Sequence, residues 1–187
     1  LLSTHQKGMQ MSSTQTNIDF TKLPSKLNLG CGFDKRPGYT NIDLSEMHNP
    51  DVVADVLDLS FLPQNHYTEI IAQDILEHLS RTSTKRALLH WAALLQHKGT
   101  LHLRVPNILG VAKMLSSPKN QAVEKQESII QNLFGTQAYT GDFHFTTFTA
   151  VVLKSYLNQC GFSVVDFKER DEWLFDVSAI KEREVNP

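Results

Sequence analysis

A short apolar run that ends in two closely spaced glycines, at residues 26–33, most constrains how this chain folds. Gly30 and Gly32 carry no Cβ and tolerate positive φ, so the backbone there can approach a ligand closely. Two further short apolar runs follow and end in Asp43 and Asp55. An acid that ends the second strand of such a series can accept from ribose hydroxyls. Three such strand ends in succession indicate a nucleoside pocket.

The glycine pair has a simpler alternative, because a lone Gly-x-Gly is more often an ordinary tight turn. The dinucleotide fingerprint Gly-x-Gly-x-x-Gly is also incomplete, since Lys35 stands at its third glycine and the next glycine is Gly38. A pyrophosphate is poorly served without a phosphate-binding helix start. A cofactor with an adenosine but no phosphate therefore fits better.

Apolar runs alternate with helical patterns along the rest of the chain, which is typical of a parallel α/β sheet. The predicted strands are residues 27–29, 40–44, 51–54, 69–72, 100–105, 163–167 and 174–180. Helices are predicted over 84–95, with Lys98 and Gly99 as the stop, and over 150–159. The more polar segment 108–133 contains Pro118, which predicts broken helices over the strand ends.

Five stretches resemble the class I S-adenosylmethionine-dependent methyltransferases, particularly small bacterial ones. They are NLGCG at 28–32, YTNID at 39–43, DVLDLSF at 55–61, QDILEHL at 73–79 and FGTQAYTGDFH at 134–144. The resemblance covers most of residues 25–180. It implies an α/β, Rossmann-like seven-stranded sheet flanked by helices, in the order 3-2-1-4-5-7-6 with the last strand antiparallel.

The domain organisation follows from the same reading. Residues 1–20 are rich in Ser, Thr, Gln and Asn and are predicted to be a flexible arm. Residues 21–187 are predicted to form one methyltransferase domain, because a chain of 187 residues is the size of one domain. Within it, residues 108–148 are predicted to be a helical lid and substrate-recognition insertion.

The resemblance implies S-adenosyl-L-methionine as cofactor and S-adenosyl-L-homocysteine as product. Gly30 and Gly32 would line its methionine and ribose side, Asp43 would bind the ribose, and Asp55 with the amide of Val56 would bracket the adenine edge. The predicted cofactor contacts are Asn28, Leu29, Gly30, Cys31, Gly32, Asp43, Leu44, Asp55, Val56, Leu57, Gln73 and Asp74. Many family members differ from this chain by having an acid at the position of Asn28 and a third glycine at Asp34 or Lys35.

Methyl transfer from a sulfonium is an in-line displacement, so alignment of the acceptor supplies much of the acceleration. A histidine or carboxylate can also accept a proton from the acceptor. His144 is the first catalytic candidate, because it shares a turn-rich loop with Tyr139 and Asp142, which are also candidates. The alternative is that His144 and Asp142 order this loop and that Tyr139 buries its ring.

His78 follows the fourth predicted strand, and the resemblance places it with Glu77 at the floor of the substrate pocket. The alternative is a set of residues that favours a helix start. Arg104 could bind a substrate carboxylate or phosphate, or pair with an internal acid. The predicted substrate contacts are thus Arg104, Tyr139 and His144.

The remaining histidines are not clustered in the sequence, and no metal site is predicted. Cys31 and Cys160 are predicted to be buried free thiols. A net charge of -2 with scattered basic residues argues against nucleic acid as a partner. No apolar run reaches the roughly 20 residues of a membrane span and no secretory signal is recognised, so a cytoplasmic location is expected.

These features predict a methyltransferase that acts on an oxygen or nitrogen of a small polar metabolite or natural-product intermediate. Two alternatives stay open: a regulatory protein that binds the nucleoside or S-adenosylmethionine without catalysis, and an enzyme that uses the same cofactor for other chemistry. The expected partner is a small-molecule acceptor. Both a monomer and a homodimer are compatible with the sequence.

Overall fold

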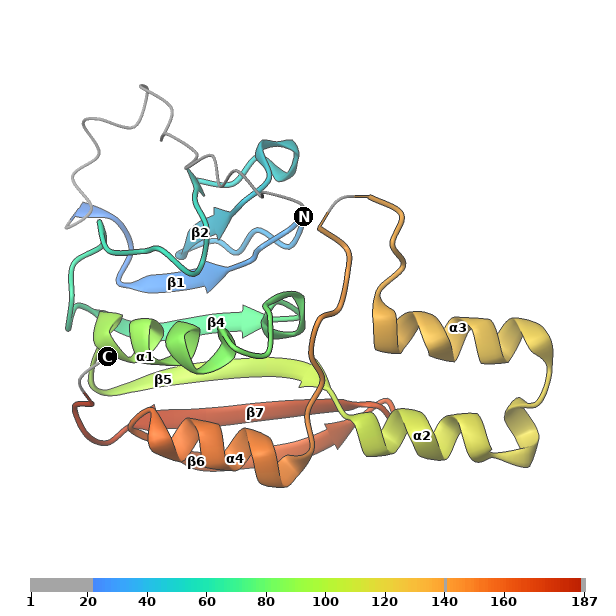
Figure 1. The fold of residues 1–187 in the computed structure, drawn as a ribbon. Helices are drawn as coiled ribbons and strands as arrows, with labels where there is room; N and C mark the ends of the chain where they lie inside the picture. The colour runs from blue at the N-terminus through green and yellow to red at the C-terminus, as the bar shows by residue number, and fades with distance from the viewer. Residues whose placement is uncertain (1–21, 140, 186–187) are drawn as a thin grey trace, which may run out of the picture.

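A computed structural model describes residues 22–139 and 141–185, so the predicted arm at 1–20 lies outside the described residues. Seven strands form one sheet in the order β3-β2-β1-β4-β5-β7-β6 (Figure 1). The strands are β1 Lys26–Leu29, β2 Thr40–Asp43, β3 Val52–Val53, β4 Tyr67–Gln73, β5 Leu95–Pro106, β6 Phe162–Arg170 and β7 Leu174–Lys181. β1 to β5 pair in parallel, and β7 is antiparallel to β5 and β6. The predicted strand order and orientation are confirmed.

Four α-helices and three short 3-10 turns connect these strands in the described residues. The helices are α1 Thr84–Leu94, α2 Ile108–Ser116, α3 Val123–Phe134 and α4 Ala150–Gln159, and the turns are η2 Glu46–His48, η3 Leu76–His78 and η4 Pro118–Asn120. The predicted break in segment 108–133 is confirmed, because η4 begins at Pro118 between α2 and α3.

The predicted stop of the first long helix was wrong. α1 ends at Leu94, and Leu95 already begins β5, where it pairs with Tyr67. Leu95 is fully buried, so the chain leaves the helix where a side chain must enter the core. Lys98 and Gly99 instead lie within β5, and Lys98 carries the positive φ of an irregularity in the pairing with β4.

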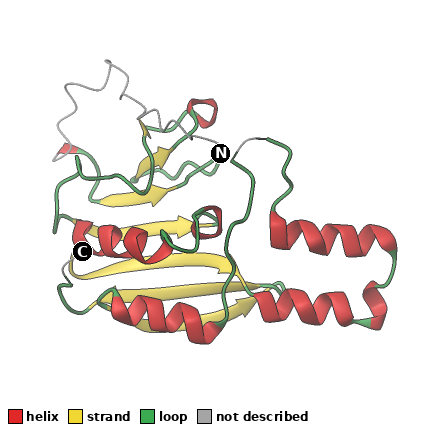
Figure 2. Cartoon of the chain, in the orientation of Figure 1, coloured by secondary structure: helices red, strands yellow, loops and turns green. Residues whose placement is uncertain are grey.

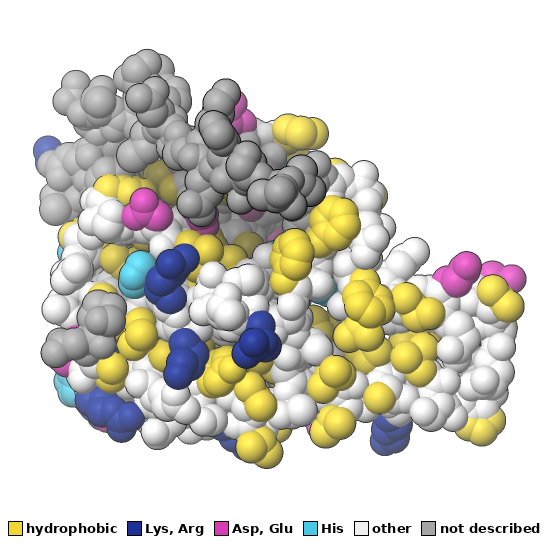
Figure 3. All heavy atoms as spheres, viewed as in Figure 1, with side chains coloured by type: hydrophobic (Ala, Val, Ile, Leu, Met, Phe, Trp, Pro, Cys, Tyr) yellow, Lys and Arg dark blue, Asp and Glu magenta, His cyan; other side chains and the backbone are white. Residues whose placement is uncertain are grey.

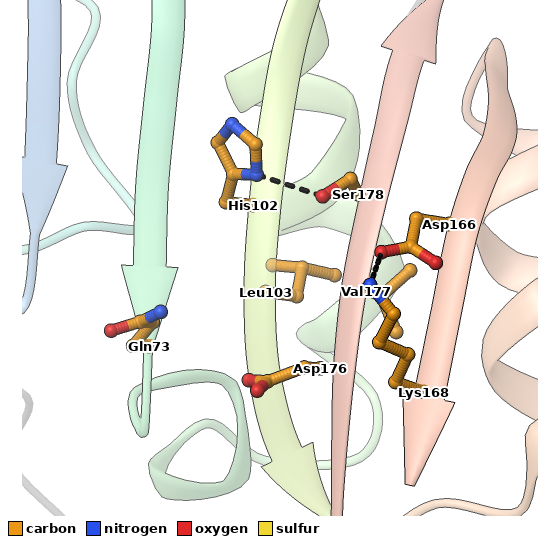
Figure 4. Close-up of a pocket in the computed structure, with 8 residues that line it drawn as sticks. All are labelled: Gln73, His102, Leu103, Asp166, Lys168, Asp176, Val177 and Ser178. Atoms are coloured by element: carbon orange, nitrogen blue, oxygen red, sulfur yellow. Dashed lines mark hydrogen bonds and ion pairs between the residues drawn. The ribbon is translucent and has the colours of Figure 1, made fainter. Parts of the chain in front are cut away.

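The sheet is covered by α-helices on one face. α1 and α4 lie side by side on that face (Figures 1 and 2), where Trp91 and Leu153 are fully buried. Among the described residues no helix covers the opposite face. A cavity of about 230 Å³ lies on it, lined by Gln73, His102, Leu103, Asp166, Lys168, Asp176, Val177 and Ser178 (Figure 4).

No α-helix lies between β1, β2 and β3, and the 3-10 turn η2 between β2 and β3 is drawn as helix in Figure 2. The connections are short segments that begin at the carboxyl ends of parallel strands. That edge of a sheet is where α/β proteins bind their ligands. None of the helices in the described parts of the chain has the length and hydropathy of a membrane span.

Candidate functional site

The glycine turn after β1 needs its two glycines for different reasons. Both have positive φ, 62° at Gly30 and 50° at Gly32. A Cβ at Gly30 would lie 2.5 Å from the side chain of Ile75, so this glycine is required by packing. A Cβ at Gly32 would meet nothing within 4 Å. Gly32 is therefore the position that faces open space, where a ligand can approach the backbone.

Asp43 links the end of β2 to this turn. Its Oδ2 accepts from the backbone N–H of Gly32 at 2.8 Å, and its Oδ1 accepts from the N–H of Ser45 at 2.8 Å. Nδ1 of His48 also lies 2.9 Å from Oδ1. A carboxylate has about four lone-pair sites, so Oδ2 keeps the capacity to accept from a further donor.

Asn28 and Cys31 are buried at the glycine turn. The amide of Asn28 is buried and donates to the carbonyl of Asp34 at 2.7 Å and to Oδ1 of Asn41 at 3.0 Å, so it orders the segment after the glycines. Leu29 is fully buried in β1. Burial raises the pKa of the Cys31 thiol to about 11, which keeps it protonated and unreactive. Both cysteines are free and buried, as predicted.

The remaining predicted adenine-side residues follow β2 and β3. Leu44 and Asp55 are exposed, and Oδ1 of Asp55 accepts from the N–H of Leu57 at 2.9 Å. Val56 is buried, and its carbonyl accepts from Nε1 of Trp91 at 3.0 Å. The structure thus places Leu44 and Asp55 at the surface beside the ends of adjacent parallel strands.

Gln73 is the last residue of β4 and Asp74 follows it, and both side chains pair with arginines of this chain. Oε1 of Gln73 accepts from Arg36 at 2.8 Å, and the side chain lines the cavity on the helix-free face (Figure 4). The Asp74 carboxylate accepts from Nε of Arg104 at 2.8 Å and from a terminal nitrogen of the same guanidinium. Of the two roles open to Arg104, the structure shows the pair with an internal acid, which also raises the pKa of Arg104.

The loop after α3 is hydrogen-bonded to η3, which follows β4 in the chain. The backbone N–H groups of Phe145 and Thr146 both donate to the carbonyl of Glu77, at 2.8 and 3.2 Å. This tether brings His144 over His78, and the two rings lie edge to face with their centroids 4.8 Å apart. Two histidines that are far apart in the sequence therefore meet at one place.

Glu77, which the resemblance placed with His78 at the floor of the substrate pocket, lies next to this histidine pair. Its side chain is buried, and its Oε2 has no hydrogen-bond partner among the described residues. Burial raises the pKa of Glu77 to about 8. Burial also lowers the pKa of His144, and the neighbouring His78 adds to this effect. The sequence left open whether Glu77 lines the pocket or only favours a helix start, and the structure shows that its side chain is buried.

Tyr139 and Asp142 lie in the same loop. Asp142 accepts from the backbone N–H of Thr136 at 3.1 Å and from the Thr136 hydroxyl, so it orders the loop. Tyr139 is exposed, and its pKa is raised by burial of its hydroxyl and then by the charges of Asp142 and Asp43. Asp142 therefore supports the loop, whereas the side chain of Tyr139 is open to solvent.

No protein-family model matches the chain, and no curated protein matches its sequence. Solved structures do match its fold. One is 1,6-didemethyltoxoflavin-N1-methyltransferase of Burkholderia thailandensis with 1,6-didemethyltoxoflavin and S-adenosylhomocysteine bound, at a TM-score of 0.56 and 14% identity over 84% of this chain and 71% of that one. Another is an S-adenosylmethionine-dependent methyltransferase of Methanosarcina mazei. It matches at a TM-score of 0.61 and 17% identity, over 84% of this chain and 92% of that one. The chain has the fold of class I S-adenosylmethionine-dependent methyltransferases.

Proposed function

We propose that this protein is an S-adenosylmethionine-dependent methyltransferase that methylates an oxygen or nitrogen of a small polar metabolite or natural-product intermediate. The observation that carries the proposal is the glycine turn. Gly32 faces open space and its N–H is held by Asp43, at the carboxyl edge of a sheet with the methyltransferase strand order. Solved structures with the same fold include methyltransferases, one of them with S-adenosylhomocysteine bound.

The residues at this edge fit such a cofactor. Gly32 leaves room for a ligand against the backbone, and Oδ2 of Asp43 has remaining capacity to accept from a ribose hydroxyl. Asp55 is exposed after β3, where it would accept from the adenine edge. Bound S-adenosylmethionine would supply an electrophilic methyl group, with the electrons of the broken carbon–sulfur bond remaining on sulfur.

The chain's own residues would position the acceptor and handle its proton. The backbone N–H of His78 donates to the carbonyl of Ile75, whose side chain packs against Gly30, and the ring of His144 lies against that of His78. Nδ1 of each ring contacts a backbone carbonyl, which leaves the lone pair on Nε2. That lone pair can accept a proton from the acceptor or bind a cation.

The surface around this edge favours a small acceptor. Aromatic side chains of the loop after α3 are exposed, including Tyr139 and Phe145, and hydrophobic side chains continue along α2 and α3 (Figure 3). A net charge of -2 gives no general attraction for a polyanion. We therefore propose that the small polar acceptor also carries an apolar part, and that the acceptor is not a nucleic acid.

Isothermal titration tests the cofactor assignment. We expect S-adenosylhomocysteine to bind with a Kd in the micromolar range or below, and NAD and NADP to bind far more weakly. Asp43→Ala should weaken binding by about 1 to 3 kcal/mol, because the ribose hydroxyls lose a charged acceptor. This corresponds to roughly 5- to 150-fold in Kd.

Asp51→Ala is the matched control for this titration. Asp51 also accepts from a backbone N–H, that of Asn41 at 2.9 Å, and from a side chain, but it does not contact the glycine turn. Its removal should leave the affinity for S-adenosylhomocysteine within about twofold of the original. Equal losses in both variants, or NAD binding as tight as that of S-adenosylhomocysteine, would contradict the proposal.

A further inference from the structure

We propose that Glu77, His78 and His144 bind a divalent transition-metal ion of the zinc or iron(II) type. One potential ligand atom from each of the three side chains lies within 4.8 Å of the other two. The proposal goes beyond methyl transfer and does not depend on it. The three residues are distinct from the glycine turn and Asp43, which are the residues proposed to bind the cofactor.

The two histidines are oriented as metal ligands are. Nδ1 of His78 lies 3.2 Å from the carbonyl of Phe143, and Nδ1 of His144 lies 3.2 Å from the carbonyl of Asn132. A carbonyl can only accept, so each Nδ1 carries the proton and each Nε2 is left with a lone pair. Metal-binding histidines almost always donate their other ring N–H in this way, which fixes the tautomer and the ring orientation.

Glu77 would supply the negative charge, because metal binding releases the proton of a carboxyl ligand. It is 2% exposed, and its Oε2 has no hydrogen-bond partner among the described residues. A buried carboxylate oxygen without a partner is costly, and a cation beside it removes that cost. The nearby guanidinium of Arg104 is already paired with Asp74, so it does not provide that partner.

The ligand set selects the kind of ion. Two imidazole nitrogens and one carboxylate oxygen are the protein ligands of many catalytic zinc sites and of the iron(II) facial triad, which both leave positions open. Magnesium and calcium prefer oxygen ligands throughout. Bonds of about 2.0–2.2 Å place the ligands of one ion roughly 3–4 Å apart, so the side chains would close by about 1 Å. Both rings are only partly buried, which permits such a rotation.

The test uses the full chain after treatment with a chelator and its removal. Zinc chloride is titrated calorimetrically, and cobalt(II) is titrated by visible absorption, which reports coordination directly. We expect one ion per chain. His78→Ala, His144→Ala and the isosteric Glu77→Gln should each weaken binding at least about 10-fold, since even indirect partners of metal ligands cost that much. Circular dichroism verifies that each variant is folded, and Glu77→Gln keeps the test valid if a histidine variant is not.

His90→Ala is the matched control. His90 is also partly buried, and its Nδ1 contacts the carbonyl of Leu57 at 3.1 Å, but it lies on α1 outside the cluster. Its loss should leave zinc and cobalt affinity unchanged. The proposal is overturned if neither ion binds saturably, or if the Glu77→Gln and histidine variants bind as the original does. Titration of the chelator-treated protein with S-adenosylhomocysteine tests the proposed function separately, because that binding does not require the metal.

Discussion

At the scale of single residues, substitution of the two glycines in the turn after β1 should have different effects. One should mainly lower stability and the other should mainly lower ligand affinity. Gly30→Ala and Gly32→Ala both place a Cβ at positive φ, which costs about 1–2 kcal/mol in each case. Gly30→Ala also drives this Cβ against Ile75, so it should lower the free energy of unfolding further. Gly32→Ala adds a methyl group to open space, so it should lower S-adenosylhomocysteine affinity at least about 10-fold, a difference of 1.4 kcal/mol.

Chemical denaturation without ligand and calorimetric titration of the same two variants provide the comparison. Each variant is the control for the other, since the backbone strain is similar. A Gly32→Ala variant with unchanged affinity would show that the ligand does not approach this part of the backbone. A Gly30→Ala variant no less stable than Gly32→Ala would show that Ile75 moves aside without cost.

The residues that follow strand ends could be predicted from the sequence, because the apolar run that marks a strand and the residue that ends it are neighbours in the chain. Gly32 and Asp43 each lie at the end of a short apolar run, and the structure brings them within one hydrogen bond of each other. The partner of Arg104 could not be decided, since Asp74 lies on another strand. Glu77 could not be distinguished from a surface acid, because its burial depends on a loop that returns from α3.

At the scale of elements, α3 should be far less protected than α1. Only Ile129 of α3 is buried, whereas α1 buries Leu88, Trp91 and four further residues. A helix with few buried contacts opens with a low free energy. We expect amide hydrogen exchange in α3 to be at least about 100-fold faster than in α1.

Hydrogen exchange followed by mass spectrometry measures both helices in one sample. A tenfold dilution of the protein is the control, because self-association through the exposed face of α3 would make its protection depend on concentration. Slow exchange in α3 at every concentration would contradict the expected low stability of this helix.

The elements were predictable where apolar residues recur at helical spacing over a whole segment, or where a proline interrupts a helix. The sequence of α1 has helical spacing, and Pro118 marks the break between α2 and α3. The end of α1 was not predictable from its stop signal, Lys98 and Gly99. Burial of Leu95 against the sheet starts β5 directly after the helix, and this tertiary contact overrides the local glycine signal.

At the scale of the whole molecule, the cofactor should stabilise the fold by mass action. A ligand that binds only the folded state at 100 times its Kd adds about 2.7 kcal/mol to the free energy of unfolding. For a chain of this size, 1 kcal/mol corresponds to about 2–4 °C in Tm. S-adenosylhomocysteine should therefore raise Tm by roughly 5–10 °C.

A thermal melt followed by circular dichroism measures this shift, with adenosine and NAD at the same concentration as controls. Adenosine lacks the methionine part and should give a smaller increase. An unchanged Tm at saturating S-adenosylhomocysteine would mean that the glycine-turn edge does not hold this ligand in the folded protein.

The bond between His144 and the last turn of α3 has a mechanical consequence. Nδ1 of His144 contacts the carbonyl of Asn132, and the His144 ring lies against His78, next to buried Glu77. α3, which buries a single residue, is thus connected to the buried Glu77 through the side chains of His144 and His78. We therefore expect a tilt of α3 to shift the His144 ring first, and with it the surroundings of His78 and Glu77, without a change in the sheet.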